Sequence, residues 1–171
     1  MMMAKLRRID SVQPCLLNRL TDDKPSVPNE TAAQRTMSMQ EYKEAVIRDL
    51  ADLLNSKAPL DSDDVYDFAE VAESVLAYGV RDSCGVTSSD PGATEIEREF
   101  EHALRIFEPR IVSGSLSVRR IVSSTDLDPT RTLSLRIEGD LWAVPAPDHL
   151  FVKTELDMEM GHCEIEGLPN G

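Results

Sequence analysis

The chain has 171 residues and a mass of 19.0 kDa, which is enough for one domain with a single core. Its formal net charge is −13, and such a charge repels phosphate backbones, so the composition argues against direct nucleic-acid binding. Aromatic residues are only 5% of the chain, and the sequence has no stretch of about 18 apolar residues, so we expect neither stacking platforms for single strands nor insertion into a membrane.

The cysteines and the N-terminal residues indicate the cellular compartment of the protein. Cys15, Cys84 and Cys163 are odd in number and far apart, which predicts free thiols in a reducing environment. Residues 1–10 carry positive charge, but no apolar stretch follows them, so they do not resemble a secretory signal. We therefore expect a cytoplasmic protein.

The first 37 residues are predicted to be a leader and flexible arm, followed by a single domain over residues 38–171. The leader has one short apolar cluster, formed by Leu16, Leu17 and Leu20. The polar, proline-rich stretch behind it cannot bury enough apolar surface to order itself alone. Either this segment is flexible or it docks on another surface.

Three helices are predicted next, from apolar residues recurring at intervals of three and four. The first spans about 39–54 behind a capping box at Ser38 and Glu41. The second spans about 63–78 and ends at Gly79. Its apolar face consists of Val65, Phe68, Ala69, Ala72, Val75 and Leu76. The third opens at a capping box formed by Thr94 and Glu97 and must end before Pro109, because proline cannot continue a helix.

From about residue 110 the apolar period changes to two, which indicates strands. Residues 132–142 and 150–158 alternate apolar with polar side chains, and the stretches 111–122 and 162–167 complete an antiparallel set of about four strands. Helices followed by strands give an α+β class, with about three N-terminal helices packed on a C-terminal antiparallel sheet of about four strands.

The residues for catalysis or metal binding form no recognisable pattern. His102, His149 and His162 lack the spacing of metal ligands, so we expect no metal site and no cofactor. One enzymatic alternative stays open. Glycoside hydrolysis needs two carboxyl groups, one of them in an apolar pocket, and Glu108 beside Phe107 is a candidate for a muramidase-like acid.

Glu108, Pro109 and Arg110 form the most unusual stretch. A carboxylate at the C-terminal end of a helix faces the negative pole of the helix dipole, which costs roughly 0.3–1 kcal/mol. In one interpretation Arg110 pairs back to Glu108, an exposed pair contributing about 0–1 kcal/mol. In the other, the corner presents a carboxylate and a forked guanidinium to a partner protein. The residues alone support both equally.

Five stretches resemble a known family over almost the whole chain from about residue 14 to residue 165. They are PCLLNRLTDD, VIRDLADLLNSK, ESVLAYGVRD, ALRIFEPRI and the closing run from LSLRIEGDLW to MGHCEI. Together they resemble the TssE family of small baseplate subunits of the bacterial type VI secretion system, grouped with phage contractile-tail wedge proteins often labelled lysozyme-like. The most specific piece is the Glu-Pro-Arg at positions 108–110.

The resemblance implies a non-enzymatic structural role. It implies the wedge subunits TssF, TssG and TssK and the contractile TssB/TssC sheath as partners, in the cytoplasm at the inner face of the inner membrane. A sheath-joining role also needs an unpaired strand edge, which we expect in the C-terminal sheet with Glu108 and Arg110 at its entrance. With this role we expect Leu16, Leu17 and Leu20 of the leader to dock on another wedge subunit. An acidic adaptor unrelated to contraction is the remaining alternative.

Overall fold

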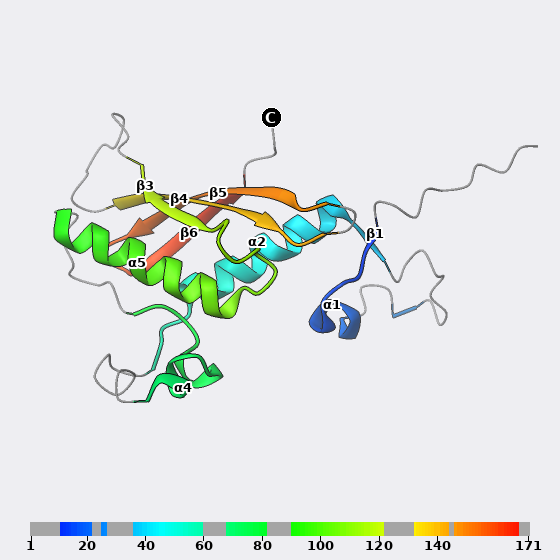
Figure 1. Cartoon of the computed structure of the whole chain (residues 1–171), viewed down its shortest axis with the longest axis horizontal. Helices are drawn as coiled ribbons and strands as arrows, with labels where there is room; N and C mark the ends of the chain where they lie inside the picture. The colour runs from blue at the N-terminus through cyan, green and yellow to red at the C-terminus, as the bar shows by residue number, and fades with distance from the viewer. Residues whose placement is uncertain are drawn as a thin grey trace, which may run out of the picture.

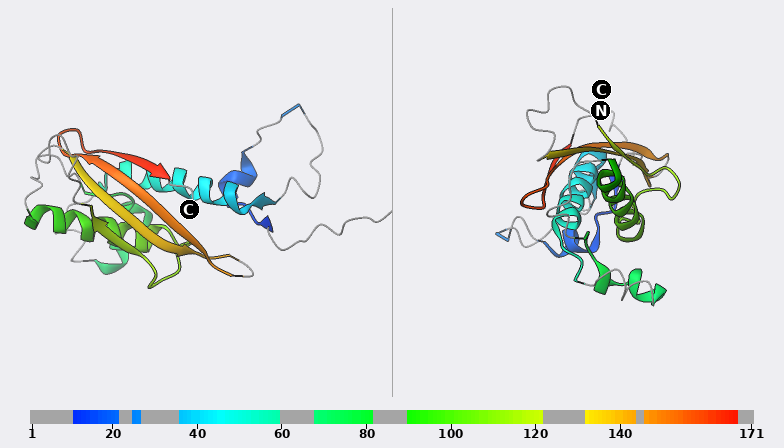
Figure 2. Two further views of the ribbon diagram at one scale, coloured as in Figure 1. Left: turned by 90° about the horizontal axis from the view of Figure 1, so that it is seen from above. Right: turned by 90° about the vertical axis from the view of Figure 1, so that its left-hand side faces the viewer.

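The computed structural model describes residues 11–21, 25–26, 36–59, 68–81, 90–121, 132–143 and 146–167. Helices α2 and α5 lie side by side against one face of a four-stranded sheet, and no helix of the described ranges covers the other face (Figures 1 and 2). This two-layer arrangement confirms the predicted α+β class.

Helix α2 (Met39–Asn55) forms as predicted. The Ser38 hydroxyl accepts a hydrogen bond from the Glu41 N–H, and the Glu41 carboxylate accepts one from the Ser38 N–H at 2.7 Å, which completes the capping box. One stripe of the helix is buried against the sheet: Tyr42, Ala45, Val46, Leu50, Leu53 and Leu54.

Helix α5 (Asp90–Phe107) begins four residues earlier than the predicted capping box. Pro91 suits the first turn, where its missing N–H costs no hydrogen bond. Glu97 has another task, because its carboxylate accepts a hydrogen bond from the backbone N–H of Arg120 at 2.5 Å. The helix ends at Phe107, as the following proline requires.

The predicted second helix is wrong in the part that the structure describes. A four-residue helix α4 (Ala69–Ala72) and a 3-10 turn η1 (Val75–Ala77) replace it, and residues 60–67 lie outside the described ranges. Ser74 separates the two because its hydroxyl donates to the Val71 carbonyl and accepts from the Leu76 N–H. Three apolar side chains of the predicted face are more than half exposed: Phe68, Val75 and Leu76.

The sheet consists of β3 (Ser117–Arg120), β4 (Thr132–Leu141), β5 (Asp148–Asp157) and β6 (His162–Gly167), antiparallel in that order. Their inward residues form the core with the helices, and the predicted alternation is confirmed by the buried Leu133, Leu135, Ile137 and Leu141. Helix α2 lies under β6 and helix α5 under β3 (Figure 2). No helix within the described ranges has the length and apolar character needed to cross a membrane.

Part of the predicted leader is described as well. Strand β1 (Ser11–Val12) pairs with β2 (Met37–Ser38), and a five-residue helix α1 (Leu16–Leu20) follows β1. Helix α1 lies beside the N-terminal half of α2 (Figure 1). Val12 and Met37 are partly buried against the core, so the ribbon anchors the start of this segment.

Candidate partner-binding site

The Glu-Pro-Arg corner joins the end of helix α5 to the edge of the sheet. The N–H of Glu108 still donates to the Leu104 carbonyl at 3.0 Å, as in one more helical turn. Two residues later the chain lies along the end of β4, where the Trp142 N–H donates to the Arg110 carbonyl at 2.8 Å. A backbone bridge between Ile111 and Leu141 continues this pairing, so the corner is fixed from both sides.

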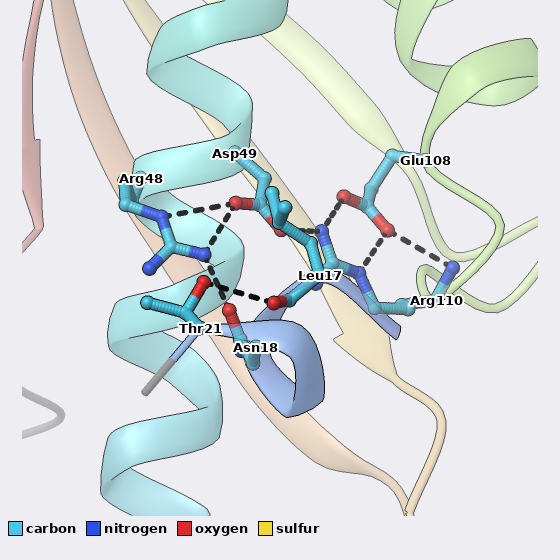
Figure 3. Close-up of polar contacts among 7 residues, drawn as sticks. All are labelled: Leu17, Asn18, Thr21, Arg48, Asp49, Glu108 and Arg110. Atoms are coloured by element: carbon cyan, nitrogen blue, oxygen red, sulfur yellow. Dashed lines mark hydrogen bonds and ion pairs between the residues drawn. The ribbon is translucent and has the colours of Figure 1, made fainter. Parts of the chain in front are cut away.

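Within the corner, two nitrogens of the Arg110 guanidinium bind the Glu108 carboxylate (Figure 3). Its Nε donates to Glu108 Oε1 at 2.6 Å, its Nη2 donates to Oε2, and its backbone N–H donates to Oε1 at 3.1 Å. This bidentate geometry is the strongest form of a carboxylate–guanidinium pair. The pairing of Arg110 back to Glu108 that the sequence allowed is therefore present.

The sequence suggested an exposed pair between Arg110 and Glu108, but the structure shows the pair largely buried. Glu108 is only 4% exposed. Burial lowers the pKa of Arg110, but the hydrogen bonds and the charge of Glu108, together with the charge of Asp49, outweigh burial and raise that pKa. The guanidinium stays charged. Its positive charge offsets the unfavourable interaction between the Glu108 carboxylate and the dipole of α5, and this compensation comes from the chain itself.

Two further charged residues extend this pair across helix α2 (Figure 3). Asp49 Oδ2 lies 2.9 Å from Arg110 Nη2, and Asp49 Oδ1 accepts from Arg48 Nη2 at 2.9 Å. Arg48 Nη2 also donates to Asn18 Oδ1 at 2.8 Å, which ties helix α1 to this cluster. The polar network Asn18–Arg48–Asp49–Arg110–Glu108 therefore connects the leader to the corner.

The two sets of residues predicted to bind partners thus meet in space, although some ninety positions separate them in the sequence. Leu16, Leu17 and Leu20 are 68%, 63% and 74% exposed, and no residue of α1 is buried. The structure shows no partner, so their role remains a prediction. Their exposure leaves an apolar surface beside the corner.

Sequence reasoning missed a pocket on the other side of the corner. Its volume is about 410 Å³, and Pro109, Ile111, Val112, Leu116 and Trp142 contribute to its lining. Trp142 is the single tryptophan of the chain and is 63% exposed, just past the end of β4. The sequence signal for this pocket was a large aromatic residue at the end of an alternating strand. From the sequence alone, Trp142 cannot be told apart from one more residue of that strand.

The geometry of Glu108 is unsuited to general-acid chemistry, because both carboxylate oxygens accept hydrogen bonds from a charged guanidinium. Among the residues that the structure describes, no three His, Cys, Asp or Glu side chains are grouped to hold a metal ion. Cys15 and Cys163 are free thiols, and Cys84 lies outside the described ranges. His162 is exposed on the face opposite Cys163.

The distinctive charged residues of this corner hold helices α1, α2 and α5 and the edge of the sheet together. Residues 40–146, more than half of the chain, match the protein family described as baseplate wedge protein gp25. The chain belongs to that family, which is also the family of TssE, so the resemblance seen in the sequence is confirmed at this level. Neither a curated protein nor a solved structure matches the chain.

Proposed function

We propose that this protein is a non-enzymatic structural subunit of a type VI secretion baseplate, connecting the wedge to the first ring of the contractile sheath. The family match over residues 40–146 carries the proposal. The expected partners are TssF, TssG and TssK in the wedge and TssB/TssC in the sheath. The site of action is the cytoplasm at the inner face of the inner membrane.

The surface around helix α1 supports contact with a wedge subunit. Leu16, Leu17 and Leu20 expose apolar area that monomeric proteins usually bury, and the Arg48–Asn18 hydrogen bond holds them beside the corner. Arg110 retains 20% side-chain exposure, and Pro109 is exposed. In this proposal Glu108 holds Arg110 in place, while Pro109, Arg110 and the three leucines contact the partner.

The sheet supports contact with the sheath by strand addition. Both outer strands are short, and strand β3 is restrained because Glu97 binds the N–H of Arg120. Strand β6 lies at the opposite edge, and an edge strand offers backbone groups to an extended segment of another protein. We place the sheath contact at β6. This differs from the expectation that Glu108 and Arg110 lie at the entrance of the open edge, because their corner pairs with β4 on the β3 side of the sheet.

Co-purification tests the wedge contact. The triple variant L16S/L17S/L20S is expected to reduce recovery with co-expressed TssF and TssG at least tenfold, because apolar burial is lost from the interface. Its melting temperature should stay within about 2 °C of the parent, because these side chains are exposed. The matched control is F68S/V75S/L76S, which removes as many exposed apolar residues from α4 and η1.

Two outcomes would contradict the proposal. Full recovery of the wedge subunits with L16S/L17S/L20S would remove the leader from the interface. Cleavage of purified peptidoglycan by the parent protein, lost on Glu108→Gln, would establish a hydrolase and overturn the non-enzymatic role.

A further inference from the structure

The carboxamide of Asn55 forms two hydrogen bonds to the backbone of strand β6. Its Oδ1 accepts from the Cys163 N–H at 2.9 Å, and its Nδ2 donates to the Cys163 carbonyl at 2.8 Å. These are the two bonds that a neighbouring strand would make with Cys163. Asn55, the last residue of helix α2, therefore takes the place of an added strand at this one position.

The same bonds identify which β6 backbone groups face away from the sheet. In an antiparallel ladder, alternate residues direct both their N–H and their C=O toward the same neighbour. Because Cys163 faces outward, Ile165 and Gly167 face outward too, while Glu164 and Glu166 bond to β5. Within the described part of the chain, no hydrogen bond is made by the outward groups of Ile165. The usable edge thus begins past Cys163.

The side chains along this edge define a partner chemistry. Ile165 points to the helix layer and packs against the core, so a residue added opposite it would lie on the same apolar side. Glu164 and Glu166 are exposed on the opposite face. Glu164 lies directly opposite Glu155 of β5, and Lys153 is already paired with Glu155 at 2.6 Å. Lys153 also lies opposite Glu166, so Glu164 is the residue that faces only a carboxylate across the ladder, and a cation on an added strand would attract it.

We propose that the β6 edge at Ile165 and Gly167 binds an extended segment of a partner in which apolar residues alternate with Lys or Arg, and that Asn55 stops the pairing at Cys163. The apolar residues lie beside Ile165, and the basic residues lie beside Glu164 and Glu166. This deepens, and rests on, the strand-addition part of the proposed function. It assigns a position and a chemistry to the contact, and it assigns Asn55 as the residue that sets the register.

Peptide binding to the full chain tests the chemistry. The probe is a fluorescein-labelled nine-residue peptide alternating valine and lysine, compared with its glutamate counterpart and with a version carrying proline at the centre. Fluorescence anisotropy should show the lysine peptide binding at least tenfold tighter than either comparison peptide, because the glutamate version repels the edge and proline lacks an N–H.

Charge reversal separates local recognition from the general attraction of a cationic peptide to an acidic protein. E164K/E166K should weaken the lysine peptide at least tenfold and favour the glutamate peptide. The matched control E70K/E73K makes the same charge change at two exposed carboxylates, Glu70 in helix α4 and Glu73 at its C-cap, and should leave binding within twofold. Equal weakening by both double variants would overturn the proposal.

Amide exchange measured by NMR tests the stop at Asn55. Bound peptide should slow exchange at Ile165 and Gly167 but leave Cys163 unchanged, because that N–H is already bonded. In Asn55→Ala the free protein should exchange Cys163 at least tenfold faster, and the peptide should then protect it. Ser56→Ala, which removes a hydroxyl at the same helix end, is the control. Unchanged Cys163 exchange in Asn55→Ala would overturn the assignment of Asn55.

These readouts fail independently of the baseplate proposal. Loss of peptide binding with intact wedge recovery would refute the β6 edge alone. Intact peptide binding with no recovery of wedge subunits would refute the baseplate role and leave the edge standing.

Discussion

Glu108 lies just past the last turn of α5, where the dipole disfavours a carboxylate, and Arg110 compensates for it from two residues away. The sequence offered this pairing as one of two equally supported interpretations, and the structure shows that the pair forms. Its burial was not predictable, because burial depends on how segments far apart in the sequence pack together. Asp49, which shares the guanidinium, could not be found for the same reason.

Glu108→Gln is expected to lower the free energy of unfolding by about 3 kcal/mol, because it leaves a partly buried guanidinium with only Asp49 as a charged partner. Urea denaturation at pH 7 measures the change. Asp49→Asn is the comparison and should cost less, since the Asp49 side chain is 24% exposed. A loss below about 1 kcal/mol for Glu108→Gln would mean that the pair behaves as an exposed surface pair.

At the level of secondary-structure elements, caps and periodicity identified the segments that have a core to pack against. Helix α2 and strands β4 and β5 follow the predicted pattern because their apolar faces meet one another. The stretch containing α4 and η1 has the same periodicity and yet forms no long helix. Periodicity identifies an apolar face but not whether a second surface is available to bury it.

Gly79 connects that stretch to the rest of the fold, and it should not tolerate a side chain. Its φ is +121°, and an added Cβ would lie 2.4 Å from the Ser56 carbonyl oxygen. We expect Gly79→Ala to destabilise the fold by about 2–3 kcal/mol, measured by thermal unfolding. Gly114→Ala is the matched control, because Gly114 also has a positive φ of +93° but open space around its Cβ position.

The control should cost about 1 kcal/mol, from backbone strain alone. Equal losses in the two variants would show that the contact with Ser56 contributes nothing.

For the whole molecule, buried titratable groups predict lower stability in alkali. Burial raises the pKa of the Cys163 thiol from 9.0 to about 11, and burial also raises the pKa values of Tyr42 and Tyr78. A raised pKa in the folded state means that the unfolded chain releases its protons first. The stability from these groups is therefore fully present below about pH 9 and is lost as the pH rises toward 11 and beyond.

Melting temperatures from pH 7 to pH 11 test this expectation. The parent should lose on the order of 2 kcal/mol through Cys163 between pH 9 and 11, and Cys163→Ala should lose correspondingly less over the same interval. Parallel pH profiles for the two proteins would contradict the assignment of the loss to this thiol.

Helix α1 is attached differently from helices α2 and α5, which bury apolar residues against the sheet. It contributes no buried residue, and a hydrogen bond between Asn18 and Arg48 spans the gap to helix α2. Lifting it away exposes almost no core and requires little free energy beyond that contact. A partner that pulls on the exposed leucines of α1 would therefore detach this helix before it disturbs the sheet, so the contact can yield while the body of the protein stays folded.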